Sequence, residues 1–166
     1  MKLSDIDLSN IKVVIFDFDD TLAIHKDKYF TKTRRETEEK FLEFYKNAYQ
    51  NPAKFYEEIE PCYKSEVLYK FINDLRNKNI KMYCLSGMKF SFHLKAKQYF
   101  LDKHYGKGIE VLCTSSQELK LIGVKILSKI EHCKLKEILL IDDREDVIED
   151  LNQEGVKAIN VNNIEL

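Results

Sequence analysis

Short runs of apolar residues recur along the chain, and the segments between them carry apolar residues at helical spacing. The runs predict strands near residues 11–17, 80–85, 109–114, 137–142 and 156–161. The segments between them predict helices near 33–49, 65–78, 89–102, 116–131 and 144–154, with Asn79 and Gly155 as helix stops. Strands that alternate with helices indicate an α/β fold, in which helices cover both faces of a parallel sheet.

Polar residues follow three of these predicted strands directly. Asp17, Asp19 and Thr21 follow the run Val13–Phe16, Ser86 follows the second strand, and Asp142 and Asp143 end the fourth. Open α/β sheets bind their ligands outside the carboxyl ends of the strands. We therefore expect these side chains to mark a functional edge of the sheet.

The order of these motifs resembles that of the haloacid dehalogenase superfamily of hydrolases, specifically its phosphatase branch. The matching segments are DFDDT at 17–21, the serine of CLSG, a lysine at 125 and IDD at 141–143. The resemblance covers about residues 11–161 except 23–64, and the segment from residue 137 is also similar to small magnesium-dependent phosphatases without a large cap. It implies a Rossmann-like three-layer sandwich around a mostly parallel sheet.

The resemblance also implies a reaction, the hydrolysis of a phosphomonoester through an aspartyl phosphate. Asp17 would be the nucleophile, and Asp19 would protonate the departing oxygen and later activate water. Ser86 and a lysine would position the phosphoryl oxygens. Thr21, the hydroxyl of the first motif, completes the expected catalytic set.

The lysine is the open position in this set. Lys125 is preferred, because KILSKI resembles the lysine motif of small capless phosphatases at a similar distance from the acidic pair. Lys120 is the alternative. For either residue, a solvated helix face is the competing interpretation.

Several convergent carboxylates need a cation or a proton. Two unit charges about 4 Å apart repel by about 4 kcal/mol at an effective dielectric of about 20. Mg²⁺ prefers hard oxygen ligands and shares its shell with phosphate oxygens. By resemblance, Asp17 and Asp143 would bind it directly together with the backbone carbonyl of Asp19, and Asp142 would bind directly or through water.

Composition and charge fit one intracellular enzyme domain. With 166 residues and 44% apolar composition, we expect a single domain over 1–166. The net charge of −1 provides no global attraction for nucleic acid or membranes, although the basic stretch at 26–35 leaves a nucleic-acid partner open. No apolar run is long enough to span a bilayer, so a soluble, cytoplasmic protein is expected. Cys84 and Cys113 lie in apolar runs, which predicts small buried groups rather than zinc ligands.

Residues 23–64 stand outside the four motifs and are rich in aromatic and charged side chains. We expect a small helical, cap-like insertion after the first strand, and a longer first crossover is the alternative. Insertions at this position select substrates in the superfamily. The sequence leaves open a small-molecule, nucleotide or phosphoprotein substrate. It also leaves open a phosphomutase of the same superfamily and a receiver-like phosphoacceptor module.

Overall fold

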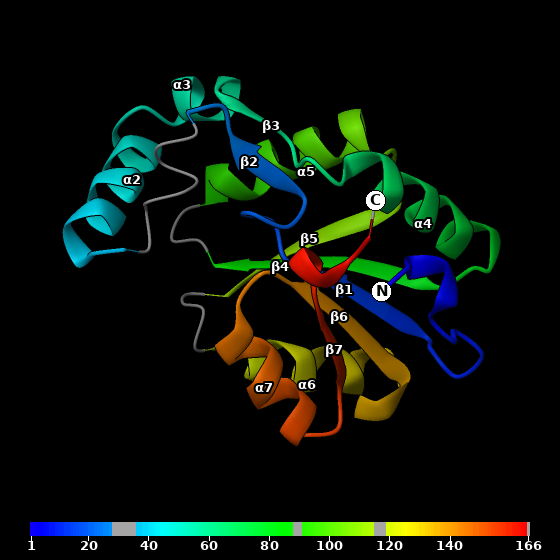
Figure 1. The fold of residues 1–166 in the computed structure, drawn as a ribbon. Coiled ribbons are helices and arrows are strands. Elements are labelled where there is room, and N and C mark those ends of the chain that lie inside the picture. Colours follow the sequence, from blue (N-terminus) through cyan, green and yellow to red (C-terminus); the bar gives the residue numbers. More distant parts are fainter. Residues whose placement is uncertain (28–35, 88–90, 115–118, 166) are drawn as a thin grey trace.

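The computed structural model describes residues 1–27, 36–87, 91–114 and 119–165. Its centre is a five-stranded sheet in the order β5-β4-β1-β6-β7 (Figure 1). The strands are β1 (Val13–Phe16), β4 (Lys81–Gly87), β5 (Ile109–Thr114), β6 (Ile138–Asp142) and β7 (Lys157–Asn160). All four neighbouring pairs in this sheet are parallel. The predicted α/β class is therefore confirmed.

Helices cover both faces of the sheet, as Figure 1 shows. The helices α4 (Ser65–Asn77) and α5 (Ser91–His104) pack on one face, and α6 (Lys120–Ile130) and α7 (Glu145–Gln153) pack on the other. Alternate residues of β1 enter two separate cores, with Val14 and Phe16 in one and Val13 and Ile15 in the other. Because both faces of β1 are buried, its sequence is continuously apolar rather than alternating.

The strand order places a topological switch point in the middle of the sheet. From β1 the chain proceeds to β4 and β5 on one side, and it then returns to β6 and β7 on the other. Counted along the chain, the parallel strands thus lie in the order 3-2-1-4-5. This order matches the Rossmann type, in which ligands bind outside the carboxyl ends of the strands that flank the switch point. Here those strands are β1 and β6.

The predicted helix stops agree with the backbone conformation. Asn79, two residues after α4, has φ 53°, and Gly155, two residues after α7, has φ 87°. Both lie in the left-handed region, which favours asparagine and glycine and ends an α-helix.

The insertion after β1 contains strands as well as helices. It comprises β2 (Ala23–His25), α2 (Glu38–Gln50), α3 (Pro52–Glu57) and β3 (Ile59–Pro61). The insertion contains helices as expected, and β2 and β3 add an antiparallel pair where it leaves and rejoins the main fold. This pairing satisfies backbone groups of both connections. Phe44 and Phe55 pack edge to face inside the insertion, with ring centroids 5.3 Å apart.

The basic stretch at 26–35 is mostly untested, because residues 28–35 lie outside the described residues.

Cys84 is buried as expected, but Cys113 is exposed, near the end of the edge strand β5. Among the described residues, no helix combines the length and the apolar character that a membrane crossing requires.

Candidate active site

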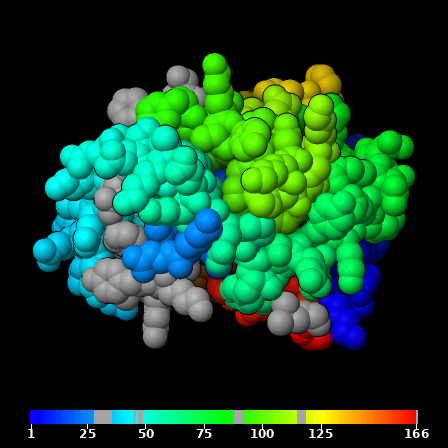
Figure 2. Space-filling view, turned by 90° about the horizontal axis from the view of Figure 1, so that it is seen from above, coloured from blue at the N-terminus to red at the C-terminus, as the bar shows by residue number. Residues whose placement is uncertain are grey.

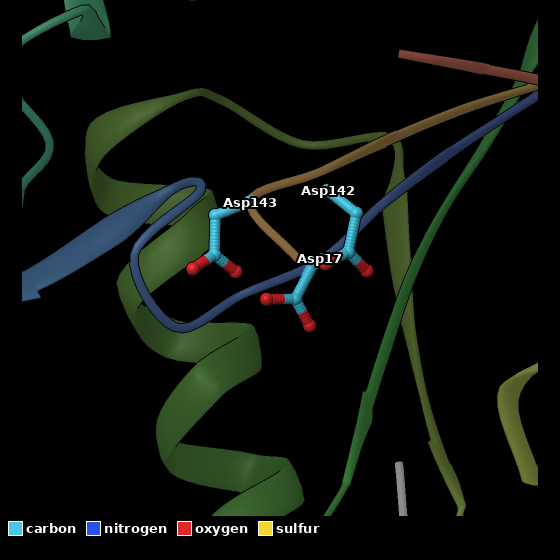
Figure 3. Close-up of side chains that lie close together, drawn as sticks. All are labelled: Asp17, Asp142 and Asp143. Atoms are coloured by element: carbon cyan, nitrogen blue, oxygen red, sulfur yellow. The ribbon is translucent and has the colours of Figure 1, made fainter. Parts of the chain in front are cut away.

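Three carboxylates converge at the carboxyl ends of β1 and β6 (Figure 3). Asp17 directly follows β1, Asp142 is the last residue of β6, and Asp143 comes next. One oxygen from each lies within 4.8 Å of the others. Asp17 and Asp142 are buried, whereas Asp143 is partly exposed. The fold thus brings together three of the four residues that were predicted to hold a metal, at the switch point of the sheet.

Lys120, the first residue of α6, forms ion pairs with two of these carboxylates. Its Nζ lies 2.6 Å from Oδ1 of Asp17 and 2.5 Å from Oδ2 of Asp142. The side chain is only 2% exposed, so bulk water does not screen these contacts.

Lys125 lies elsewhere, and the preference for it is corrected. Its Nζ contacts Oε2 of Glu154 at 2.8 Å, and its side chain is 43% exposed. The reason is the phase of α6, because Lys120, Val124 and Leu127 share the buried face of this helix. A residue five positions after Lys120 points in a different direction.

A close approach of α6 to the sheet helps to bring Lys120 to the acids. Gly123 lies one turn after Lys120, and a Cβ at this position would be 3.0 Å from Cδ2 of Leu85 and 3.2 Å from Cγ2 of Thr114. The helix backbone therefore packs directly against side chains of β4 and β5. A larger residue would require these neighbours to shift.

Burial and charge act against each other in this cluster. Burial raises the pKa of Asp17, the nearby Lys120 ammonium opposes that rise, and the Asp142 and Asp19 carboxylates add to it. For Lys120, burial alone would lower the pKa, but the carboxylates of Asp17 and Asp142 raise it above its ordinary value. Lys120 is therefore an ammonium at neutral pH. A buried site with three converging carboxylates also suits a hard divalent cation.

Hydrogen bonds from the start of α7 and from the end of β7 hold the acidic pair. Oδ1 of Asp142 accepts a hydrogen bond from the backbone N–H of Arg144 at 3.0 Å. Asn160 at the end of β7 donates from Nδ2 to the carbonyl oxygen of Asp143 at 3.3 Å. Both oxygens of Asp142 are thus engaged by donors, and its orientation is defined from two sides.

A second buried lysine, Lys97 of α5, joins Asp19 to Ser86. Its Nζ lies 2.9 Å from Oδ2 of Asp19 and 2.6 Å from Oγ of Ser86. Sequence reasoning missed Lys97. The available signal was its spacing, because Lys97 lies four residues from His93 and four from Leu101, and both of these are buried. A lysine at such a core position of a helix needs a specific partner.

Thr21 is fully buried in the loop between β1 and β2. Its Oγ1 makes no hydrogen bond to any residue in the described part of the chain. The loop itself is held by backbone bonds, from Leu22 N–H to the carbonyl of Phe18 at 3.0 Å and from Asp20 N–H to that of Ala23 at 2.8 Å. A catalytic role for Thr21 stays a prediction.

No protein-family model and no curated protein matches this sequence, but solved structures do. The chain is similar to a haloacid dehalogenase-like hydrolase from Bacteroides fragilis, with a TM-score of 0.62 and 16% identity over 90% of this chain and 87% of that one. It is also similar to a phosphoserine phosphatase that was solved as an analogue of its phospho-aspartyl intermediate, with a TM-score of 0.57 and 16% identity over 90% and 86% of the two chains.

A third similar structure is a HAD family enzyme from Bacteroides thetaiotaomicron in complex with magnesium and inorganic phosphate. Its TM-score is 0.51, with 14% identity over 90% of this chain and 93% of that one. Each of these three comparisons covers 90% of this chain. The chain therefore has the fold of the haloacid dehalogenase-like hydrolases, as its motifs predicted.

Proposed function

We propose that the protein is a Mg²⁺-dependent phosphomonoester hydrolase that works through an aspartyl phosphate on Asp17. The observation that carries the proposal is the convergence of Asp17, Asp142 and Asp143 at the switch point, with Lys120 in contact with two of them. Phosphoryl transfer depends mainly on positioning and on electrostatic stabilisation, and this edge of the sheet offers both. The names of two similar structures, one with a phospho-aspartyl analogue and one with magnesium and phosphate, support the same chemistry.

The donor set fits magnesium. Asp17 and Asp143 would hold the ion directly together with the backbone carbonyl of Asp19, and Asp142 would bind directly or through water. Carboxylate and carbonyl oxygens are the ligands that this hard cation prefers. When bound, it would supply positive charge for the carboxylates and for the phosphoryl oxygens.

The residues divide the reaction into two displacements. The carboxylate of Asp17 attacks phosphorus, and the bond from phosphorus to the departing oxygen breaks as Asp19 gives that oxygen a proton. Asp19 then accepts a proton from water as the water oxygen attacks phosphorus, which frees the Asp17 carboxylate and releases phosphate. Lys120 and Ser86 hold the phosphoryl oxygens throughout.

The insertion over 23–64 is the part that we assign to substrate selection. It contacts α5 through a 2.8 Å hydrogen bond between the hydroxyl of Tyr56 and Nδ1 of His93. Figure 2 shows α2 and α3 in cyan beside α5 in green on the surface above the sheet. A groove of about 470 Å³ between α3, β3 and α5 is lined by residues that include Tyr56, Ala96 and Phe100. A phosphorylated small molecule, nucleotide or phosphoprotein is the substrate class.

The strand order argues against the receiver-like alternative. Receivers have the flavodoxin-like order 2-1-3-4-5, whereas this sheet has the order 3-2-1-4-5. A phosphomutase shares the first displacement, but it transfers the phosphoryl group to a second substrate rather than to water. Product analysis therefore separates a phosphomutase from a hydrolase.

The deciding experiment measures phosphate release from a panel of phosphomonoesters with Mg²⁺, with EDTA, and with Mg²⁺ restored after EDTA. We expect many turnovers per enzyme with Mg²⁺, loss with EDTA, and recovery on restoration. Undiminished turnover after thorough chelation would contradict the metal role. Transfer of phosphate to a second substrate molecule without net release would indicate a mutase instead.

A further inference from the structure

We propose that Lys97 is a positioning residue for proton transfer, acting through Asp19 and Ser86; this inference rests on the proposed function. Its Nζ is within hydrogen-bond distance of both side chains, and Lys97 is only 3% exposed. Lys97 comes from α5, on the opposite face of the sheet from the α6 helix that supplies Lys120 (Figure 1). The site thus has two buried ammonium groups with separate partners.

The chemistry of an ammonium group fixes the direction of both hydrogen bonds. It has three donors and no acceptor, so Oγ of Ser86 and Oδ2 of Asp19 must both accept. The Ser86 hydroxyl proton is then directed away from Lys97 and can be donated to a phosphoryl oxygen. Because Oδ2 of Asp19 faces the ammonium, Lys97 fixes the orientation of the carboxyl group that transfers the proton.

The surroundings of Lys97 hold it in this position. Its Nζ lies 4.4 Å from the ring centroid of Phe18, the residue between the proposed nucleophile and the proposed acid. Phe18 is fully buried and packs edge to face with Phe100 of α5, with centroids 5.5 Å apart. A buried ammonium is costly unless it is paired, and here its carboxylate partner is the residue that must be oriented.

The sharpest test compares substrates that differ in their need for a proton. Dinitrophenyl phosphate expels a leaving group that needs no protonation, whereas an alkyl phosphate releases a strongly basic alkoxide that does. Because kcat/KM reports the first displacement alone, Lys97→Met should lower it about 10²-fold or more for the alkyl phosphate and about 10-fold or less for dinitrophenyl phosphate. Equal losses on both substrates would overturn the positioning role.

A control variant and a second substitution at Lys97 strengthen the comparison of the two substrates. Lys95 is exposed on the same helix, so Lys95→Met should leave both rates unchanged. Lys97→Gln retains an N–H donor without the charge, and its loss on the alkyl phosphate should fall between wild type and Lys97→Met. If Lys97→Met does not fold, Lys97→Gln alone provides the test. Its loss of kcat/KM on the alkyl phosphate is then divided by its loss on dinitrophenyl phosphate, and a ratio near one contradicts the proposal.

A double-mutant cycle tests whether Lys97 acts through Asp19. In the Asp19→Asn background, Lys97→Met should cost little more on the alkyl phosphate, because the proton donor is already gone. Full additivity of the two losses would show that Lys97 acts independently of Asp19. Absence of turnover in the wild-type protein would instead contradict the proposed function, so the two failures are distinguishable.

Discussion

The helices α5 and α6 approach the same edge of the sheet from opposite faces, and each brings one buried lysine. Lys120 contacts two carboxylates, Asp17 and Asp142, which come from the strands on either side of the switch point. Lys97 contacts one carboxylate and one hydroxyl, those of Asp19 and Ser86. The first pairing surrounds the proposed nucleophile, and the second surrounds the proposed proton donor. Two residues that are separated only by Phe18 thus receive different electrostatic environments.

This division explains how neighbouring aspartates can perform different tasks. Asp17 lies among the other acids of the cluster, where Lys120 keeps it in place and a metal ion is expected. The Oδ2 atom of Asp19 contacts the ammonium of Lys97 from α5. Buried ion pairs contribute little net stability relative to apolar packing, because desolvation offsets attraction. We therefore interpret both lysines as setting the geometry of the site rather than as strengthening the fold.

The largest expected effect separates the two aspartates. Asp17→Asn should abolish turnover and the covalent phosphoenzyme, because no carboxylate remains to attack phosphorus. Asp19→Asn should slow turnover severely and yet allow phosphoenzyme to form from dinitrophenyl phosphate, since that leaving group departs without a proton. Acid quench followed by hydroxylamine treatment measures the acyl phosphate. Phosphate found on a different aspartate, or full turnover in Asp17→Asn, would remove the distinction.

The next effect distinguishes Lys120 from Lys125, two of the lysines of α6. Lys120→Met should lower kcat by roughly 10²-fold or more, the scale of losing one transition-state stabiliser. It should also weaken folding, because it leaves the buried Asp17 and Asp142 without their ammonium partner, which costs about 3–5 kcal/mol. Lys125→Met removes only a surface contact with Glu154 and should change kcat little. Steady-state kinetics and urea unfolding of both variants provide the measurements, and the reverse ranking would restore Lys125 to the site.

The smallest effect concerns the contact between α5 and the insertion. Burial, with a further contribution from the Lys97 ammonium and opposition from Asp19, lowers the pKa of His93 to about 4. The folded protein therefore keeps His93 neutral where the unfolded chain binds a proton. The stability that this group contributes is present above pH 6.5, the ordinary value, and is lost as the pH falls from there towards 4.

Urea unfolding at pH 7 and pH 5 measures this effect. From pH 7 to pH 5 the urea midpoint of the wild type should decrease more than the midpoint of His93→Gln. The two decreases should differ by an amount on the order of a few tenths of a molar. Above pH 7 the two proteins should show the same pH dependence. An equal acid response in both would mean that His93 does not sense pH in the folded protein.

The sequence predicted that the three acids lie together, because they stand at the ends of strands whose apolar runs are unmistakable. Asp17, Asp142 and Asp143 needed only the rule that parallel strands end at a common edge. The lysine was harder, because both faces of α6 carry apolar residues. Val124 and Leu127 are buried, whereas Ile122, Ile126 and Ile130 are exposed. The periodicity therefore does not reveal which lysine faces the sheet.

Lys97 illustrates the same limit on α5. In the segment HLKAK, Lys95 is exposed and Lys97 is buried, although the two look alike in the sequence. The sequence pattern also did not predict the two strands of the insertion. Each spans only three residues, which is too short for an apolar–polar alternation to be recognised. Pairing between β2 and β3 depends on the return of the chain after α3, which local sequence does not specify.

By itself, the sequence determined the strands of the sheet, their alternation with helices and the acids at the strand ends, because strand burial and turn chemistry are local properties of the chain. Only the tertiary structure decided which side chains of each helix reach the acids. The orientation of a helix about its own axis depends on how it packs against the sheet, as the close approach at Gly123 illustrates for α6. That packing turned Lys120 and Lys97 inward, and it left Lys125 and Lys95 at the surface.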